Sequence, residues 1–172
     1  MDIVKTATDS TRAEMLSSAF FILLGLSFLL ASLGFWQLGR TDMARAYVIP
    51  MLVAGALILI IGLGLFFPSH ARLTSFPAAY ATDAAGFVAD EIARADHVLN
   101  EYRIAVFRVI PLIIAACALA IPFFESPLWR ASLITTIAMM AVILVVDTNA
   151  NARLEAYREQ LALAERSILL PM

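Results

Sequence analysis

Residues 17–39 read SSAFFILLGLSFLLASLGFWQLG, and no charged side chain occurs between Glu14 and Arg40. This uncharged run of 25 residues exceeds the roughly 20 residues that a helix needs to cross a bilayer. A second uncharged run follows a short polar connection and ends near Pro68. The two runs predict membrane-spanning helices over about 17–39 and 46–68.

Two shorter uncharged runs occur later in the chain, at 109–124 and 131–146, and each has 16 residues. Such a run covers about 24 Å of helix, whereas the hydrocarbon core is about 30 Å thick. Each helix must therefore gain length from its flanks, where basic side chains can extend toward the headgroups. We predict spans over about 105–124 and 129–147, which gives a single all-α membrane domain with four transmembrane helices.

The composition agrees with a membrane protein and excludes several other classes. Hydrophobic residues make up 62% of the 172 residues and charged residues 15%, against about 45–50% and about 25% in soluble domains. The formal net charge of -2 leaves no basic surface of the kind that binds nucleic acid. Cys117 is the only cysteine, so the chain cannot form an internal disulfide.

The distribution of basic residues predicts the orientation in the membrane. Four spans place both termini and the central loop on one side, and nine of the twelve Lys and Arg residues fall there: Lys5, Arg12, Arg72, Arg94, Arg103, Arg108, Arg153, Arg158 and Arg166. Because cytoplasmic segments carry an excess of basic residues, we expect both termini to be cytoplasmic. The preference for Arg over Lys, with many alanines, favours a bacterial source and hence the bacterial inner membrane.

The stretch from Pro77 to Arg108 is too polar for lipid but contains no further proline, which favours a helix that continues into the third span. Its apolar residues step alternately by four and three, the pattern of a coiled-coil seam: Val88, Ile92, Ala95, Leu99, Tyr102, Val106 and Val109. We expect this extension to cover about 78–104. Pro111 removes the backbone hydrogen bond to Phe107 and should bend the helix there.

A second extension leaves the fourth span over about 148–168, with apolar residues at the same steps: Ala150, Leu154, Tyr157, Leu161, Ala164 and Ile168. A tight connection around Pro127 makes the two extensions antiparallel neighbours. With Arg108 level with Asp147, the seams pair as Tyr102 with Leu154, Leu99 with Tyr157, Ala95 with Leu161, Ile92 with Ala164 and Val88 with Ile168. The sequence therefore predicts a coiled-coil-like hairpin in the cytoplasm.

An amphipathic helix that lies on the membrane is the alternative for 78–101. Its polar face is largely acidic: Asp83, Asp90, Glu91, Asp96 and Glu101. Helices that bind anionic headgroups are usually rich in Lys and Arg, so this composition favours the hairpin.

Polar residues on the predicted hairpin are the candidate partner-binding residues: Asp90, Asp96, His97, Glu101, Glu155 and Glu159. Arg108 and Asp147 lie at the cytoplasmic ends of their spans and are expected to neutralise one another as a structural ion pair. His97 and Glu101 are four residues apart, which resembles half of a metal site. No second half is apparent, and we interpret these residues as a solvated charged face.

The spans offer little chemistry for catalysis or ion transport. Away from their ends they contain no Asp, Glu, His or Lys, the residues that proton relays and intramembrane enzymes use. His70 at the membrane edge and His97 far along an extension are poorly placed to ligate haem. The sequence has no phosphate-binding loop, nucleophile elbow or metalloprotease motif. We therefore expect no enzymatic activity, metal or cofactor.

Small residues mark where helices can approach closely: Ser27 and Ala31, Gly55, Gly62 and Gly64, and Ala116 and Ala120. Together, these features predict a protein that acts by binding, with the lipid bilayer and a protein as partners and without nucleic acid. The most specific hypothesis is an immunity protein against a membrane-directed toxin. The alternatives are an accessory or assembly subunit of a larger inner-membrane complex, and a homo-oligomeric channel or stator-like unit.

Overall fold

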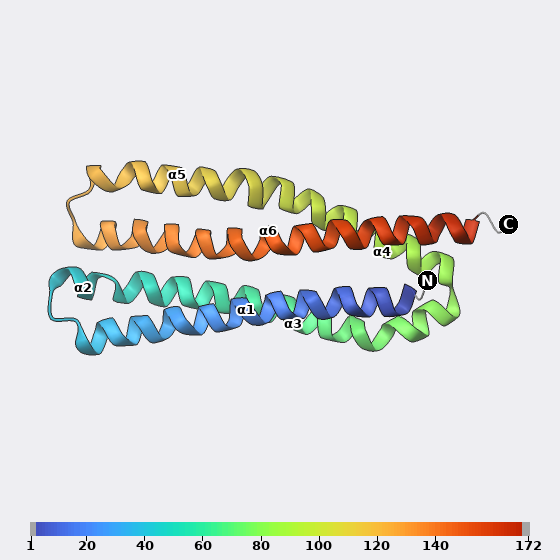
Figure 1. Cartoon of the computed structure of the whole chain (residues 1–172). Helices are drawn as coiled ribbons and strands as arrows, with labels where there is room; N and C mark the ends of the chain where they lie inside the picture. Colours follow the sequence, from blue (N-terminus) through green and yellow to red (C-terminus); the bar gives the residue numbers. More distant parts are fainter. Residues whose placement is uncertain (1–2, 170–172) are drawn as a thin grey trace.

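The computed structural model describes residues 3–169, and the side chains of residues 3–167. Nearly every residue in this part of the chain is helical (Figure 1). Four helical stretches are long and apolar enough to cross a membrane: Ile3–Leu38, Asp42–Thr82, Ala84–Phe123 and Pro127–Ser167. The prediction of an all-helical chain with four helices long and apolar enough to cross a membrane is confirmed.

The elements along the chain are α1 (Ile3–Leu38), α2 (Asp42–Ala46), α3 (Val48–Thr82), α4 (Ala84–Glu101), the π-helical η1 (Tyr102–Val109), α5 (Ile110–Ala120), the 3₁₀-helical η2 (Ile121–Phe123) and α6 (Pro127–Leu169). Figure 1 shows both described chain ends and the α3–α4 turn at one end of the bundle, here called the terminal end. The connection through α2 and the α5–α6 connection lie at the other end, here called the loop end (Figure 1).

Helix α3 is longer than the predicted second span. The sequence predicts that Pro68 ends this span, but α3 continues through Pro68 and Pro77 to Thr82. An interior proline removes one backbone hydrogen bond, and packing compensates for this loss because Phe76 is only 3% exposed. Helix α1 likewise begins at Ile3, so all four long helices extend past the apolar segments at the terminal end.

The turn between α3 and α4 depends on Asp83. Its backbone is extended, and its carboxylate accepts a hydrogen bond of 2.9 Å from the backbone N–H of Gly86, which caps α4. The predicted extension over 78–104 therefore begins later, at Ala84, and residues 78–82 belong to α3.

Helices α1 and α3 pack closely through glycines. A Cβ atom added at Gly25 would lie 2.8 Å from the backbone nitrogen of Leu59 and 3.0 Å from the carbonyl oxygen of Gly55. A Cβ atom at Gly62 would lie 2.9 Å from the backbone nitrogen of Ile22. Two of the predicted small-residue positions, Gly55 and Gly62, are therefore contacts between helices, because only glycine lets the backbones approach this far.

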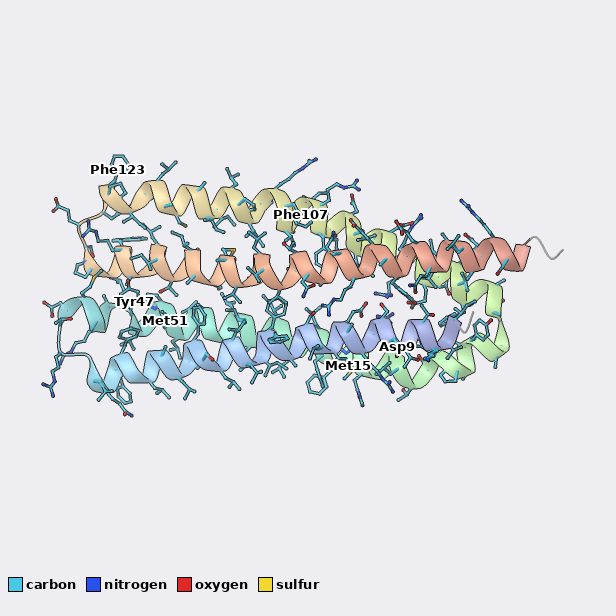
Figure 2. All side chains as sticks on the ribbon, viewed as in Figure 1. Asp9, Met15, Tyr47, Met51, Phe107 and Phe123 are labelled. Atoms are coloured by element: carbon cyan, nitrogen blue, oxygen red, sulfur yellow. The ribbon has the colours of Figure 1, made fainter. Side chains whose placement is uncertain are left out.

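Helix α6 packs against α1 and α3, whereas α5 packs against α6 and, within the described residues, contacts neither α1 nor α3. The outward face of the third span is accordingly apolar and exposed, with Leu112 and Leu119 about 70% exposed. Phe123, at the loop end, points outward from the bundle (Figure 2). In a bilayer these side chains contact lipid, so the spans form a three-helix group with α5 on one side.

A hydrophobic core closes the terminal end and joins all four helices. Most of its buried residues are those of the two predicted seams: Val88, Ala95, Leu154, Tyr157, Leu161 and Ala164. Ile3 and Ala7 of α1 and Phe76 of α3 belong to the same core. Helices α4 and α6 therefore pack together with α1 and α3 in a four-helix core, and a separate coiled-coil hairpin stays a prediction. The side chain of Ile168, predicted to pair with Val88, lies outside the described residues.

The π-helical turns of η1 come directly before Pro111, where the sequence predicts a bend. They shift the buried face by one residue, because Val106 and Ile110 are 3% and 8% exposed while the predicted seam residue Val109 is 45% exposed. The wider turn lies where Pro111 leaves the carbonyl of Phe107 without a helical donor. In Figure 1 the chain passes behind α6 within α4 and then approaches α5 through η1, so α5 and the start of α4 are seen on opposite sides of α6 in this view.

We predict that Gly25→Ala destabilises the bundle by about 1–3 kcal/mol, because the new methyl group meets backbone atoms of α3 that cannot move aside. Unfolding of the purified protein in detergent, followed by tryptophan fluorescence, measures this change. Gly34→Ala on the same helix is the control, since its Cβ has no neighbour within 4 Å and alanine favours helix. Equal stabilities for the two variants would contradict the close packing.

Candidate functional site

The six candidate partner-binding residues, Asp90, Asp96, His97, Glu101, Glu155 and Glu159, are all exposed on α4 and α6. At 3.6 residues per turn, Asp90, His97 and Glu101 lie on the face of α4 opposite the buried Val88 and Ala95. The same periodicity places Glu155 and Glu159 on the outer face of α6. We call these six residues the acidic surface.

Neighbouring side chains hold parts of the acidic surface in place. Arg158 of α6 donates a hydrogen bond of 2.9 Å from Nε to Asp96 Oδ1 of α4. His97 Nε2 lies 3.3 Å from Glu101 Oε1, one turn apart on α4. Within residues 3–169 no group of three or more potential metal ligands forms. Exposed pairs of this kind contribute about 0–1 kcal/mol each, so the surface is not what stabilises the fold.

The predicted ion pair between Arg108 and Asp147 is absent from the described residues. Arg108 is exposed on η1, at the edge of the bundle. The Asp147 side chain instead lines a cavity between helices, where its carboxylate forms no hydrogen bond or ion pair with any residue that the structure describes. The prediction placed Arg108 level with Asp147 on regular α-helices, but the π-helical turns of η1 change the direction of the Arg108 side chain.

The most extensive polar contacts centre on Glu91 of α4, which is 7% exposed. Arg72 of α3 donates from Nη2 to both of its carboxylate oxygens, at 3.1 and 3.0 Å. Arg94 donates from Nη2 at 3.1 Å, and the Tyr157 hydroxyl of α6 donates at 2.9 Å. One buried carboxylate therefore connects α3, α4 and α6.

Glu14 extends these contacts to α1. Its Oε2 accepts from Arg72 Nη1 and its Oε1 accepts from Arg94 Nη1, both at 3.2 Å. The Ser69 hydroxyl of α3 lies 3.5 Å from the same carboxylate. We call Glu14, Arg72, Glu91, Arg94 and Tyr157 the arginine–carboxylate network. It has two carboxylates and two guanidinium groups, so its charges balance.

The network controls the ionisation of Glu91. Burial alone would raise the pKa of Glu91, but the guanidinium groups of Arg94 and Arg72 outweigh burial, and the pKa lies below the ordinary value. Burial and the facing carboxylate of Glu91 raise the pKa of Tyr157, so its hydroxyl keeps its proton and acts as a donor. Removing one partner of such a buried pair typically costs about 3–5 kcal/mol, because the other charge stays buried and unpaired.

A cavity of about 250 Å³ lies beside the network, between α1, α3, α4, η1 and α6. Toward the loop end its wall is apolar and includes Phe21, Leu65 and Pro68. Its charged and phenolic wall residues are Glu14, Arg72, Arg94, Tyr102, Asp147 and Arg153. Arg153 of α6 donates a hydrogen bond to the Ser17 hydroxyl of α1. The cavity thus joins an apolar wall to a charged one, as many ligand sites do.

The sequence prediction assigned Glu91 to a solvated acidic face and used Arg72 and Arg94 only as indicators of orientation. Two signals in the sequence point to the network. Glu91 lies three residues after Val88 and four before Ala95, and it therefore shares the face of the seam. Glu14 is the last charge before the first span and Arg72 the first Arg or Lys after the second, so antiparallel helices bring them to one level.

The arrangement can bind charged groups, since it combines guanidinium, carboxylate and hydroxyl groups beside an apolar wall. No family model, curated protein or solved structure matches the chain. The residues themselves therefore carry the functional argument.

We predict that Glu91→Gln lowers stability at neutral pH by about 3 kcal/mol and flattens its dependence on acid. The pKa of Glu91 is lower in the folded protein than in the unfolded protein, where it is about 4.5. The Glu91 carboxylate therefore stabilises the fold at pH values above the unfolded pKa, and this stabilisation is lost as the pH falls through the pKa of the folded state. Thermal unfolding in detergent from pH 3 to pH 8, roughly the range over which carboxylates titrate, measures both effects.

The exposed Glu155→Gln serves as the control and should follow the native curve. If Glu91→Gln and the native protein lost stability in parallel as the pH falls, Glu91 would not be a charged member of the network.

Proposed function

We propose that this chain is a non-enzymatic membrane protein that binds a protein partner through the acidic surface on α4 and α6. The observation that carries the proposal is the separation of roles on these two helices. Six of the predicted seam residues on these helices are buried in the four-helix core, while all six residues of the acidic surface are exposed. Exposed polar residues that do not stabilise a fold are available for recognition.

The charge of the surface indicates the chemistry of the partner. Arg158 neutralises Asp96, but Asp90, Glu155 and Glu159 form no ion pair with a basic residue in the described part of the chain. A partner with a complementary basic surface would be attracted to these carboxylates and would associate faster at low ionic strength. We therefore propose a basic protein surface as the binding partner.

We also propose that the protein lies in a bacterial inner membrane with its terminal end in the cytoplasm. The basic residues support this orientation, because nine of twelve lie on the terminal side of the spans. The acidic surface would then face the cytoplasm. It would be accessible to soluble cytoplasmic proteins and to cytoplasmic segments of other membrane proteins.

The most specific form of the proposal remains an immunity protein that protects against a membrane-directed toxin. A toxin gene beside its own would support this form, whereas an operon of respiratory or secretion genes would favour an accessory or assembly subunit. A channel or stator-like oligomer is the third alternative. It is favoured by the exposed apolar face of α5, which within residues 3–169 contacts only α6 among the long helices, and bilayer conductance would support it.

We predict that Glu155→Lys combined with Glu159→Lys abolishes co-purification of the partner while expression and thermal stability change little, within about 0.5 kcal/mol. The reason is that both carboxylates are exposed and outside the network. Cross-linking in gently solubilised membranes, followed by mass spectrometry, identifies the partner and measures its recovery.

The control variant carries Thr74→Lys and Ala78→Lys, which place two lysines at the same spacing on the exposed face of α3. Recovery of the partner should be unchanged in this control. Full recovery from a variant with Asp90, Glu101, Glu155 and Glu159 all replaced by Lys would contradict the proposal and would move the function into the spans.

A further inference from the structure

The cavity contains two charged side chains that the arginine–carboxylate network does not neutralise. Arg72 and Arg94 are matched by Glu14 and Glu91. Arg153 has a hydroxyl partner, Ser17, but no carboxylate within ion-pair distance among the described residues. The Asp147 carboxylate has neither a hydrogen bond nor an ion pair among the described residues. The cavity therefore presents one cationic and one anionic group, each without an opposite charge.

These two groups lie on one wall of the cavity. Asp147 and Arg153 both belong to α6, six residues or about 9 Å apart along the helix axis, and both line the same space. Phe21 and Leu65 form an apolar wall from α1 and α3. Charges that are partly removed from water without a partner are unfavourable, and a ligand that supplies both opposite charges removes this cost.

The opposite charges of Asp147 and Arg153 restrict which kind of ligand can neutralise both. An anion would neutralise Arg153 but leave Asp147 unpaired, and a cation would do the reverse. A molecule that carries both charges leaves neither group unpaired. We propose that this cavity binds a small zwitterion, whose ammonium group pairs with Asp147, whose anionic group pairs with Arg153, and whose apolar part lies against Phe21 and Leu65.

An amino acid with an apolar side chain and an aminophospholipid headgroup share this chemistry. The order of the two groups along α6 favours the amino acid. Asp147 lies nearer the apolar segment of α6 than Arg153 does. In a phospholipid inserted from the membrane, the phosphate lies nearer the acyl chains than the ammonium group does. Such a lipid would therefore place its phosphate beside Asp147 and its ammonium group beside Arg153, where the charges repel. The experiment therefore includes both sources.

The test uses the full chain in nanodiscs of phosphatidylglycerol, which has no ammonium group. Binding of L-leucine, L-leucine methyl ester and N-acetyl-L-leucine is measured by titration calorimetry. The ester lacks the anionic group and the N-acetyl compound lacks the ammonium group. L-leucine should bind at least about tenfold more tightly than either, since each blocked compound loses one charge-assisted contact. A second set of nanodiscs contains phosphatidylethanolamine, and thermal stabilisation relative to phosphatidylglycerol measures lipid binding.

Two variants test which side chain binds each charged group of the ligand. Asp147→Asn should remove the preference for L-leucine over N-acetyl-L-leucine, and Arg153→Gln should remove the preference for L-leucine over its methyl ester. Arg153→Lys keeps the charge and should keep the preference, which separates a binding role from the contact with Ser17. Glu165→Gln on the same helix is the control, because Glu165 lies outside both the cavity wall and the acidic surface, and it should bind as the native chain does.

Each outcome of this experiment either supports or overturns the proposed zwitterion site. Stabilisation by phosphatidylethanolamine alone, lost in Asp147→Asn and Arg153→Gln, would support the zwitterion site and identify a lipid as its source. Equal binding of all three leucine compounds, or no effect of any zwitterion, would overturn the proposal. Neither result depends on the acidic surface, so the proposed partner binding is tested separately.

Discussion

The structure depends on the neutralisation of one buried carboxylate. Glu91 is held by two guanidinium groups and one phenol, and the same two guanidinium groups also bind Glu14. These contacts connect α1, α3, α4 and α6 at a single level of the bundle. A lone charge at this position would be strongly unfavourable, so the four helices must come together for the charge to be tolerated. The network thus specifies which helices meet at the terminal end.

The rest of the molecule follows from this junction. Along the spans, glycines bring α1 and α3 together, while α5 contacts only α6 among the long helices in the described part of the chain. The network and the core beside it join the first helical pair to the second at the terminal end. They support the acidic surface on the outside of α4 and α6, and they form the charged wall of the cavity. Both proposed binding sites therefore depend on the same contacts.

Much of the fold could be predicted from hydropathy, because runs without charge define spans independently of tertiary contacts. The seam residues were also predictable, since a buried helical face repeats at a fixed spacing. The π-helical turns at η1 were not, because they move Ile110 into the position predicted for Val109 without altering the sequence pattern. The sequence prediction missed the network, since Glu91 and Arg94 resemble ordinary surface residues until α1 and α3 pack against them.

A double-mutant cycle between Glu14 and Arg94 tests the central role of the network most directly. These residues are 80 positions apart in sequence, and their contact at 3.2 Å links α1 to α4. Unfolding free energies of Glu14→Gln, Arg94→Gln and the double variant give the coupling between them. The account predicts a favourable coupling of about 1–3 kcal/mol. Effects that add to within about 0.5 kcal/mol would contradict it, because the two residues would then be energetically independent.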